Sequence, residues 1–135
     1  MSVFSVKDLH VDFETADGTV NAVRGISLEI AKGECLGIVG ESGSGKSVSS
    51  LSLMRLVEYG GGEISGGRMI FDRKDEGQLD LREAGPDLMR TIRGNEIGMS
   101  FQEPMTALNP VFTVGRQLTE GLRVHRNMNK KQAEE

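Results

Sequence analysis

The residues best suited to chemistry form a glycine-rich stretch at positions 40–47. Its pattern is glycine, any four residues, glycine, lysine and serine. Glycines in such a stretch let successive N–H groups turn inward around phosphate oxygens, while the lysine adds a cation and the serine hydroxyl can bind Mg²⁺. The pattern predicts a phosphate-binding loop, against the alternative of a glycine-rich turn without a ligand. The loop residues are Gly40, Glu41, Ser42, Gly43, Ser44, Gly45, Lys46 and Ser47.

The segments on either side of the loop must position it. Residues 35–39 are apolar on both faces, which is typical of a strand in the middle of a covered sheet. Cys35 is then a buried core residue. Residues 46–57 contain neither glycine nor proline and carry apolar side chains at helical spacing, which predicts a helix. Such a helix would bring the positive end of its dipole to the loop.

The other segments predict an α/β domain over residues 1–135. Apolar and polar residues alternate at 9–13 and 26–30, with turns at 17–18 and 32–33, which predicts a hairpin-like pair of strands. We expect short strands at 69–71 and 97–101. Between them, the charged stretch 72–95 predicts a surface insertion with a short helix at 87–93. A later helix is indicated by Val114, Leu118 and Leu122, and Asn129 is placed to cap another.

Composition excludes several classes of protein. The formal charge of −4 argues against a general nucleic-acid binder, because a negative chain repels a phosphate backbone. A single cysteine excludes an internal disulfide framework. No apolar run approaches the roughly 20 residues that cross a bilayer, and no signal peptide is apparent. We therefore expect a cytoplasmic protein.

A phosphate loop alone does not select one enzyme class. A GTPase should carry Asp-x-x-Gly and Asn-Lys-x-Asp, but no aspartate here is followed by glycine three residues later, and residues 129–132 lack the final aspartate. A small-molecule kinase would need a lid and an acceptor site, neither of which the sequence reveals. The kinase stays open as an alternative.

Longer stretches of sequence resemble one family. The loop, together with residues 23–28 and 33–34 before it, is similar to the N-terminal part of an ATP-binding cassette (ABC) transporter ATPase. Residues 101–110, Phe-Gln-Glu-Pro-Met-Thr-Ala-Leu-Asn-Pro, resemble the Q-loop region of dipeptide and oligopeptide importer ATPases. Residues 53–56 and 122–127 look closest to the glutathione importers. The resemblance implies a P-loop NTPase fold, with a mixed sheet that has an antiparallel part and a helix after the loop.

The resemblance also implies roles for single residues. Gln102 would be the Q-loop glutamine, which can reach Mg²⁺ and sense the γ-phosphate; the alternative is a solvated glutamine after a strand. Ser47 would be the other protein ligand of Mg²⁺. Phe13 lies near the position of an aromatic residue that stacks on adenine, with a plain core residue as the alternative. The implied cofactors are ATP and Mg²⁺.

Function and partners are likewise implied. Such an ATP-binding subunit couples ATP hydrolysis to the uptake of peptides or glutathione at the cytoplasmic face of the membrane, as a peripheral protein. Its partners would be transmembrane permease subunits, a second ATP-binding module and, indirectly, an extracytoplasmic solute-binding protein; no nucleic acid is expected. A non-transport ABC protein of repair or translation is the alternative, which the string 102–110 disfavours.

Several groups needed for hydrolysis are missing from these 135 residues. We find no Leu-Ser-Gly-Gly-Gln signature, no second acidic strand end after the Q-loop, and no switch histidine. Phosphoryl transfer depends on such groups acting together, so we assign no catalytic residue and expect the chain alone to be inactive. The chain also stops inside a predicted helix that opens at Asn129, which leads us to expect the N-terminal portion of a larger ATPase module.

Overall fold

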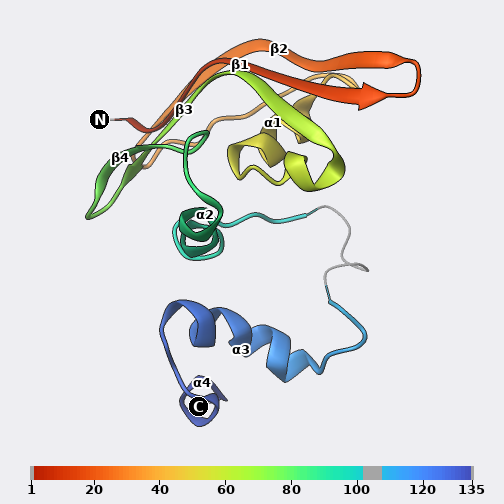
Figure 1. The fold of residues 1–135 in the computed structure, drawn as a ribbon. Coiled ribbons are helices and arrows are strands. Elements are labelled where there is room, and N and C mark those ends of the chain that lie inside the picture. Colours follow the sequence, from red (N-terminus) through yellow and green to blue (C-terminus); the bar gives the residue numbers. More distant parts are fainter. Residues whose placement is uncertain (1, 102–107, 135) are drawn as a thin grey trace. The chain divides into compact units, whose positions relative to one another are not determined.

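The computed structural model describes residues 2–101 and 108–134 (Figure 1). The chain divides into two compact units, Met1–Met89 and Arg90–Glu135. The first unit is built on a four-stranded sheet with the strand order β2-β1-β3-β4. All neighbouring strands in it are antiparallel. The strands are β1 (Ser2–Thr15), β2 (Gly18–Ala31), β3 (Gly62–Arg73) and β4 (Gly77–Asp80).

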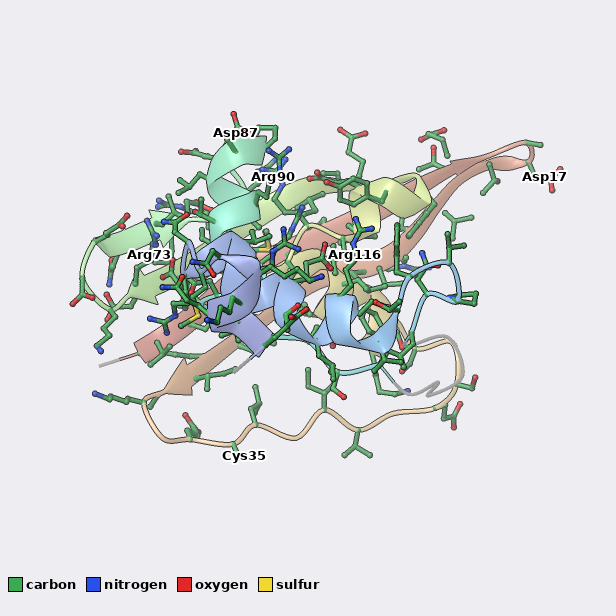
Figure 2. The ribbon with its side chains drawn as sticks, turned by 90° about the horizontal axis from the view of Figure 1, so that it is seen from below. Asp17, Cys35, Arg73, Asp87, Arg90 and Arg116 are labelled. Atoms are coloured by element: carbon green, nitrogen blue, oxygen red, sulfur yellow. The ribbon has the colours of Figure 1, made fainter. Side chains whose placement is uncertain are left out.

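Strands β1 and β2 form the hairpin that the alternating pattern predicts, although both strands are longer than expected. Thr15 pairs with Gly18 at the end of the ladder, and the Thr15 hydroxyl donates to the Gly18 carbonyl oxygen at 2.6 Å. Asp17 lies at the tip of the hairpin (Figure 2). The predicted turn is therefore confirmed, although it lies at residues 16–17, one residue earlier than expected.

A bulge in β1 keeps the apolar side chains of this strand on one face. Asp8 has a φ of 51°, and the register with β2 shifts between Val6 and Leu9. Val6 and Leu9 are 1% and 0% exposed, so the extra residue of the bulge places Leu9 on the same buried face as Val6. On β3, a Cβ atom at Gly67 would lie 2.4 Å from the Asp8 carbonyl oxygen, so the bulge requires a glycine there.

The charged stretch 72–95 is only partly a surface insertion. Its first residues extend β3 and form β4, and the predicted short helix is confirmed as α2 (Pro86–Ile92). Leu81, Met89 and Ile92 are almost completely buried, so the expectation of a surface segment is wrong for them. Apolar residues are few in this stretch, which is rich in charged residues, so no extended periodic pattern marked them as core.

Helix α1 (Lys46–Leu53) follows the glycine-rich loop, and a short 3₁₀ helix, η1 (Val57–Gly60), comes after it. The expected helix over 46–57 is thus too long at its C-terminal end. Arg55 has a φ of 53°, which an α-helix cannot accommodate, and Met54 ends α1. Helix α1 contacts β1 and β2, whereas η1 contacts β3, so both pack against the sheet.

Residues 35–39 do not form the predicted buried strand. The segment is extended between β2 and α1, its Cys35 is exposed, and Val39 is 97% exposed (Figure 2). The burial predicted for Cys35 is therefore wrong. The physical reason is that no strand among the described residues pairs with this segment, so its backbone and side chains stay uncovered. The parallel part of the expected mixed sheet is likewise not seen in the described strands.

The second unit contains two helices, α3 (Val114–His125) and α4 (Lys130–Glu134). Helix α3 confirms the prediction from its apolar spacing, but Leu118 is 72% exposed and none of the helix's side chains is buried. The strand expected at 97–101 is wrong: only Ile97 makes a bridge, to Arg93, and residues 98–101 pair with no described strand. In the described part of the chain, no helix combines the length and apolar character needed to cross a membrane.

Candidate nucleotide-binding site

The glycine-rich loop at 40–47 leads directly into α1, as the sequence pattern predicts. Gly43 and Gly45 have φ values of 79° and 88°, in the left-handed region that favours glycine. Gly45 is also the N-terminal cap of α1, and a Cβ atom there would lie 2.7 Å from the Ala22 carbonyl oxygen of β2. Glycine at this position therefore lets the loop turn while it lies against the sheet.

The Lys46 ammonium group is held by the loop itself. Its Nζ donates to the carbonyl oxygens of Gly40 at 2.7 Å and Glu41 at 2.5 Å, and contacts the Ser44 hydroxyl at 3.2 Å. An ammonium has three protons to donate, so these contacts use its full capacity. The Lys46 ammonium group thus lies over the loop.

The N-terminus of α1 has the electrostatic character of an anion site. No acidic residue occupies the first turn of this helix, so no carboxylate of the helix itself opposes its positive end. Ser49 supports the turn: its backbone N–H and its hydroxyl both donate to the Gly45 carbonyl oxygen, at 2.8 and 2.9 Å. Ser47 is exposed beside the loop, so its hydroxyl is accessible to a ligand.

Phe13 is half-buried on the same face of β1 as Leu9 and Val11. It pairs with Val20 on β2 and with Gly62 on β3. A Cβ atom at Gly62 would lie 2.8 Å from Cζ of the Phe13 ring, so the ring rests where a larger side chain would collide. This packing fits the core alternative for Phe13, and its stacking on adenine stays a prediction.

The sequence analysis named one further site residue and missed two groups that hold the site in place. Gln102 falls outside the described residues, so its predicted role stays a prediction. The sequence analysis missed Gly62, which leaves room for the Phe13 ring. It also missed the Ala22 carbonyl oxygen, which lies against Gly45 of the loop. The run of three glycines at 60–62 marks a turn, but only the strand register shows that the third faces Phe13.

Comparison with known proteins identifies the family. The sequence profile of the ABC transporter family matches residues 23–135. The chain belongs to the ABC transporter family. This membership implies the P-loop NTPase class and ATP binding, and it excludes the GTPase and small-molecule kinase alternatives.

Individual members of the ABC transporter family align over almost the whole chain. It is 53% identical over 131 residues to the glutathione import ATP-binding protein GsiA of Pectobacterium atrosepticum, which covers 97% of this chain and 21% of the relative. It is 52% identical to the dipeptide transport ATP-binding protein DppD of Bacillus subtilis, over 97% of this chain and 38% of the relative. GsiA of Escherichia coli K12 is 45% identical over 98% of the chain.

These comparisons confirm the resemblance to peptide-importer ATP-binding proteins that the loop and residues 101–110 indicate. The chain spans about a fifth of the length of GsiA and about two fifths of DppD. Activities, substrates and partners of the whole relatives therefore enter only as proposals for this chain.

Proposed function

We propose that the chain is the nucleotide-binding part of an ATP-binding subunit that drives the uptake of small peptides or glutathione. The observation that carries the proposal is the loop at 40–47, with its left-handed glycines and with Lys46 over the loop carbonyls. The likeness to GsiA and DppD, at about 50% identity, supports the importer class over an ABC protein of repair or translation.

In this proposal the loop binds the phosphate chain of ATP. Backbone N–H groups of the loop and of the first turn of α1 would donate to the phosphate oxygens. Lys46 would leave the carbonyl oxygens of Gly40 and Glu41 and bridge the β- and γ-phosphates. Phe13 would offer the face of its ring to adenine, which requires the ring to be reachable from beside Gly62.

Mg²⁺ would bind between Ser47 and the nucleotide. The exposed Ser47 hydroxyl lies at the helix end of the loop and is a hard oxygen donor, so it fits this ion. Bound Mg²⁺ would neutralise charge on the β- and γ-phosphates. Gln102 is the second ligand that we propose, from the resemblance of residues 101–110 to the Q-loop.

We further propose that the subunit is peripheral to the cytoplasmic face of a membrane. Its partners would be transmembrane permease subunits and a second ATP-binding module, which forms a homo- or heterodimer with it. A solute-binding protein outside the membrane would act through the permease. Because these 135 residues contain no signature motif and no switch histidine, we expect ATP binding without hydrolysis by the chain alone.

The test is calorimetric titration with Mg-ATP of the chain, of Lys46→Ala and of Lys32→Ala. Lys32 is exposed in the turn after β2, so its substitution removes the same charge away from the loop. We expect Lys46→Ala to lose affinity by about 10- to 100-fold, as befits a charge-assisted hydrogen bond. Lys32→Ala should bind as the unsubstituted chain does. Equal affinities in a folded Lys46→Ala variant would refute the proposed site.

A further inference from the structure

The second unit contains a cleft between α3 and α4 that the proposed function does not use. Its volume is about 400 Å³, within the range of pockets that hold small molecules. Three cationic side chains and one carboxylate line it, together with hydroxyl groups and a glycine. These residues include Arg116, Arg123, Lys130, Glu134, Thr119 and Gly115.

The wall formed by α4 is fixed by local hydrogen bonds. The Gln132 backbone N–H donates to the Asn129 side-chain oxygen at 3.0 Å, and the Asn129 N–H donates to the Gln132 side-chain oxygen at 3.0 Å. This reciprocal pair is a capping box, which satisfies two donors at the start of a helix. Ala133 is 8% exposed, so α4 also packs through this residue. The cleft is therefore a defined feature of this unit.

The two arginines of α3 point to one ligand class. They are seven residues apart, so they share a face of the helix and lie about 10 Å apart along its axis. The Arg116 guanidinium lies 4.1 Å from the centroid of the Phe112 ring, a contact that orients the cation without neutralising it. Among residues 2–101 and 108–134, neither arginine has an ion-pair partner.

The only carboxylate that lines the cleft in the described residues is already engaged. Glu134 lies 3.8 Å from the Lys130 ammonium group. Glu120 lies between the two arginines on α3 and lines a neighbouring cleft with them, but among the described residues it forms no ion pair with either. Two like charges facing one cleft repel each other, and a ligand with two acidic groups would remove that repulsion. The planar guanidinium group binds carboxylates and phosphates with two parallel hydrogen bonds.

We propose that the α3–α4 cleft binds a small dianion, a dicarboxylate or a diphosphate, with Arg116 and Arg123 each holding one acidic group. The cleft shares no residue with the loop at 40–47, and its proposed role goes beyond the proposed function. Gly115 contributes no side chain to the lining, and apart from its chain neighbours and the nearby backbone of α3, no atom lies within 4 Å of where its Cβ would be. This end of the cleft therefore has room for a ligand.

The experiment is an NMR titration of the ¹⁵N-labelled chain with glutarate and, separately, with pyrophosphate. Amides of Gly115, Thr119 and Arg123 report on the cleft, whereas amides of residues 40–47 report on the loop. We expect saturable shifts at the three cleft amides with at least one probe. Acetate, with one acidic group, should bind about tenfold more weakly, because it can engage only one arginine.

Charge-removing variants distinguish binding at the cleft from a general effect of positive charge on the chain. A chain with both Arg116→Gln and Arg123→Gln should lose at least about tenfold in affinity. Arg126→Gln removes an exposed cation that does not line the cleft, so its affinity should change by less than about twofold. Both arginines are exposed, so the double variant should fold, which the dispersion of its spectrum will show.

The outcomes are distinct. Saturable cleft shifts with glutarate alone assign a dicarboxylate, and shifts with pyrophosphate alone assign a diphosphate. Shifts that do not saturate, or an equal loss in Arg126→Gln, overturn the proposal. A chain that binds the dianion at the cleft but shows no loop shifts with Mg-ATP would refute the proposed function and leave the cleft standing.

Discussion

Two segments of equal length that were both predicted as strands have opposite fates in this molecule: the first run, residues 9–13, alternates apolar and polar residues, and the second run, residues 35–39, is apolar on both faces. The first lies in β1, where Leu9 and Val11 are 0% exposed. The second forms no strand, and its Val39 is 97% exposed. Strands β2 and β3 flank β1 on both edges, whereas no described strand flanks the second run. The difference shows that an apolar pattern favours strand formation and burial of a segment, but neighbouring strands decide whether the segment is buried.

The largest effect should come from the same substitution placed in each run. Leu9→Ala removes a fully buried side chain and should lower the free energy of unfolding by about 2–5 kcal/mol. Leu36→Ala truncates a side chain that is 41% exposed, so the loss should stay below about 1 kcal/mol. Urea unfolding followed by circular dichroism measures both. Equal losses would mean that the second run is packed in solution, and the contrast would fail.

The loop that joins the second run to α1 offers a sharper comparison. Gly43 and Gly45 are both left-handed, but only a Cβ atom at Gly45 would collide, with the Ala22 carbonyl oxygen of β2. Gly43→Ala should cost only the backbone strain, about 1–2 kcal/mol. Gly45→Ala adds the collision and should cost about 1–3 kcal/mol more, with a greater loss of ATP affinity.

Urea unfolding and Mg-ATP titration of these two glycine variants measure both quantities. The matched substitution controls for the loss of a flexible residue, because each variant replaces a left-handed glycine by alanine. If Gly43→Ala proved the more damaging, the contact between the loop and β2 would not be what constrains this turn.

How much of this fold the sequence could predict follows from the same contrast. Period-2 alternation located the β1–β2 hairpin, because each of these strands has one face in the core. It could not locate the bulge at Asp8, which depends on the close approach of Gly67 on another strand. The burial of Leu81 and Met89 was not predicted for a related reason, because burial of a single apolar residue depends on its tertiary neighbours.

The sequence predicts one of the two proposed anion sites better than the other, and the reason is physical. In our proposal the loop at 40–47 binds phosphate through backbone groups, which requires glycines at fixed spacing, so the spacing itself predicts the site. The α3–α4 cleft is made by side chains from two helices, and its shape depends on how the turn between them places α4. The basic residues were visible in the sequence, but their convergence on one cleft was not.

The thiol of Cys35 tests the exposure of the second run directly. The structure leaves Cys35 exposed, whereas a central strand would have buried it. An aromatic disulfide reagent should therefore modify the native chain at a rate within about tenfold of that in urea. Protection by several orders of magnitude in the native chain would show that residues 35–39 are covered and that the comparison with 9–13 is mistaken.

The smallest effect concerns the outer face of β1, where Asp12 lies between the core positions 11 and 13. The Asn21 side chain donates to the Asp12 carboxylate at 2.7 Å. This hydrogen bond, followed by one from Ser65, holds the pKa of Asp12 below its ordinary value. Asn21→Ala should therefore raise the pKa of Asp12, which ¹³C NMR of its carboxyl carbon measures.

The sign of the stability effect follows from linkage. Because the pKa of Asp12 is lowered on folding, its contribution to stability is complete above the ordinary carboxyl pKa and is lost as the pH falls through the folded value. Asn21→Ala should narrow the pH range, between the folded and the ordinary pKa of Asp12, over which this stability is lost. Thr19→Ala, which removes the Thr19–Glu14 bond of 2.6 Å in the same hairpin, should leave the Asp12 titration unchanged. An equal shift in both variants would trace the lowered pKa to the hairpin as a whole, and not to the Asn21 amide.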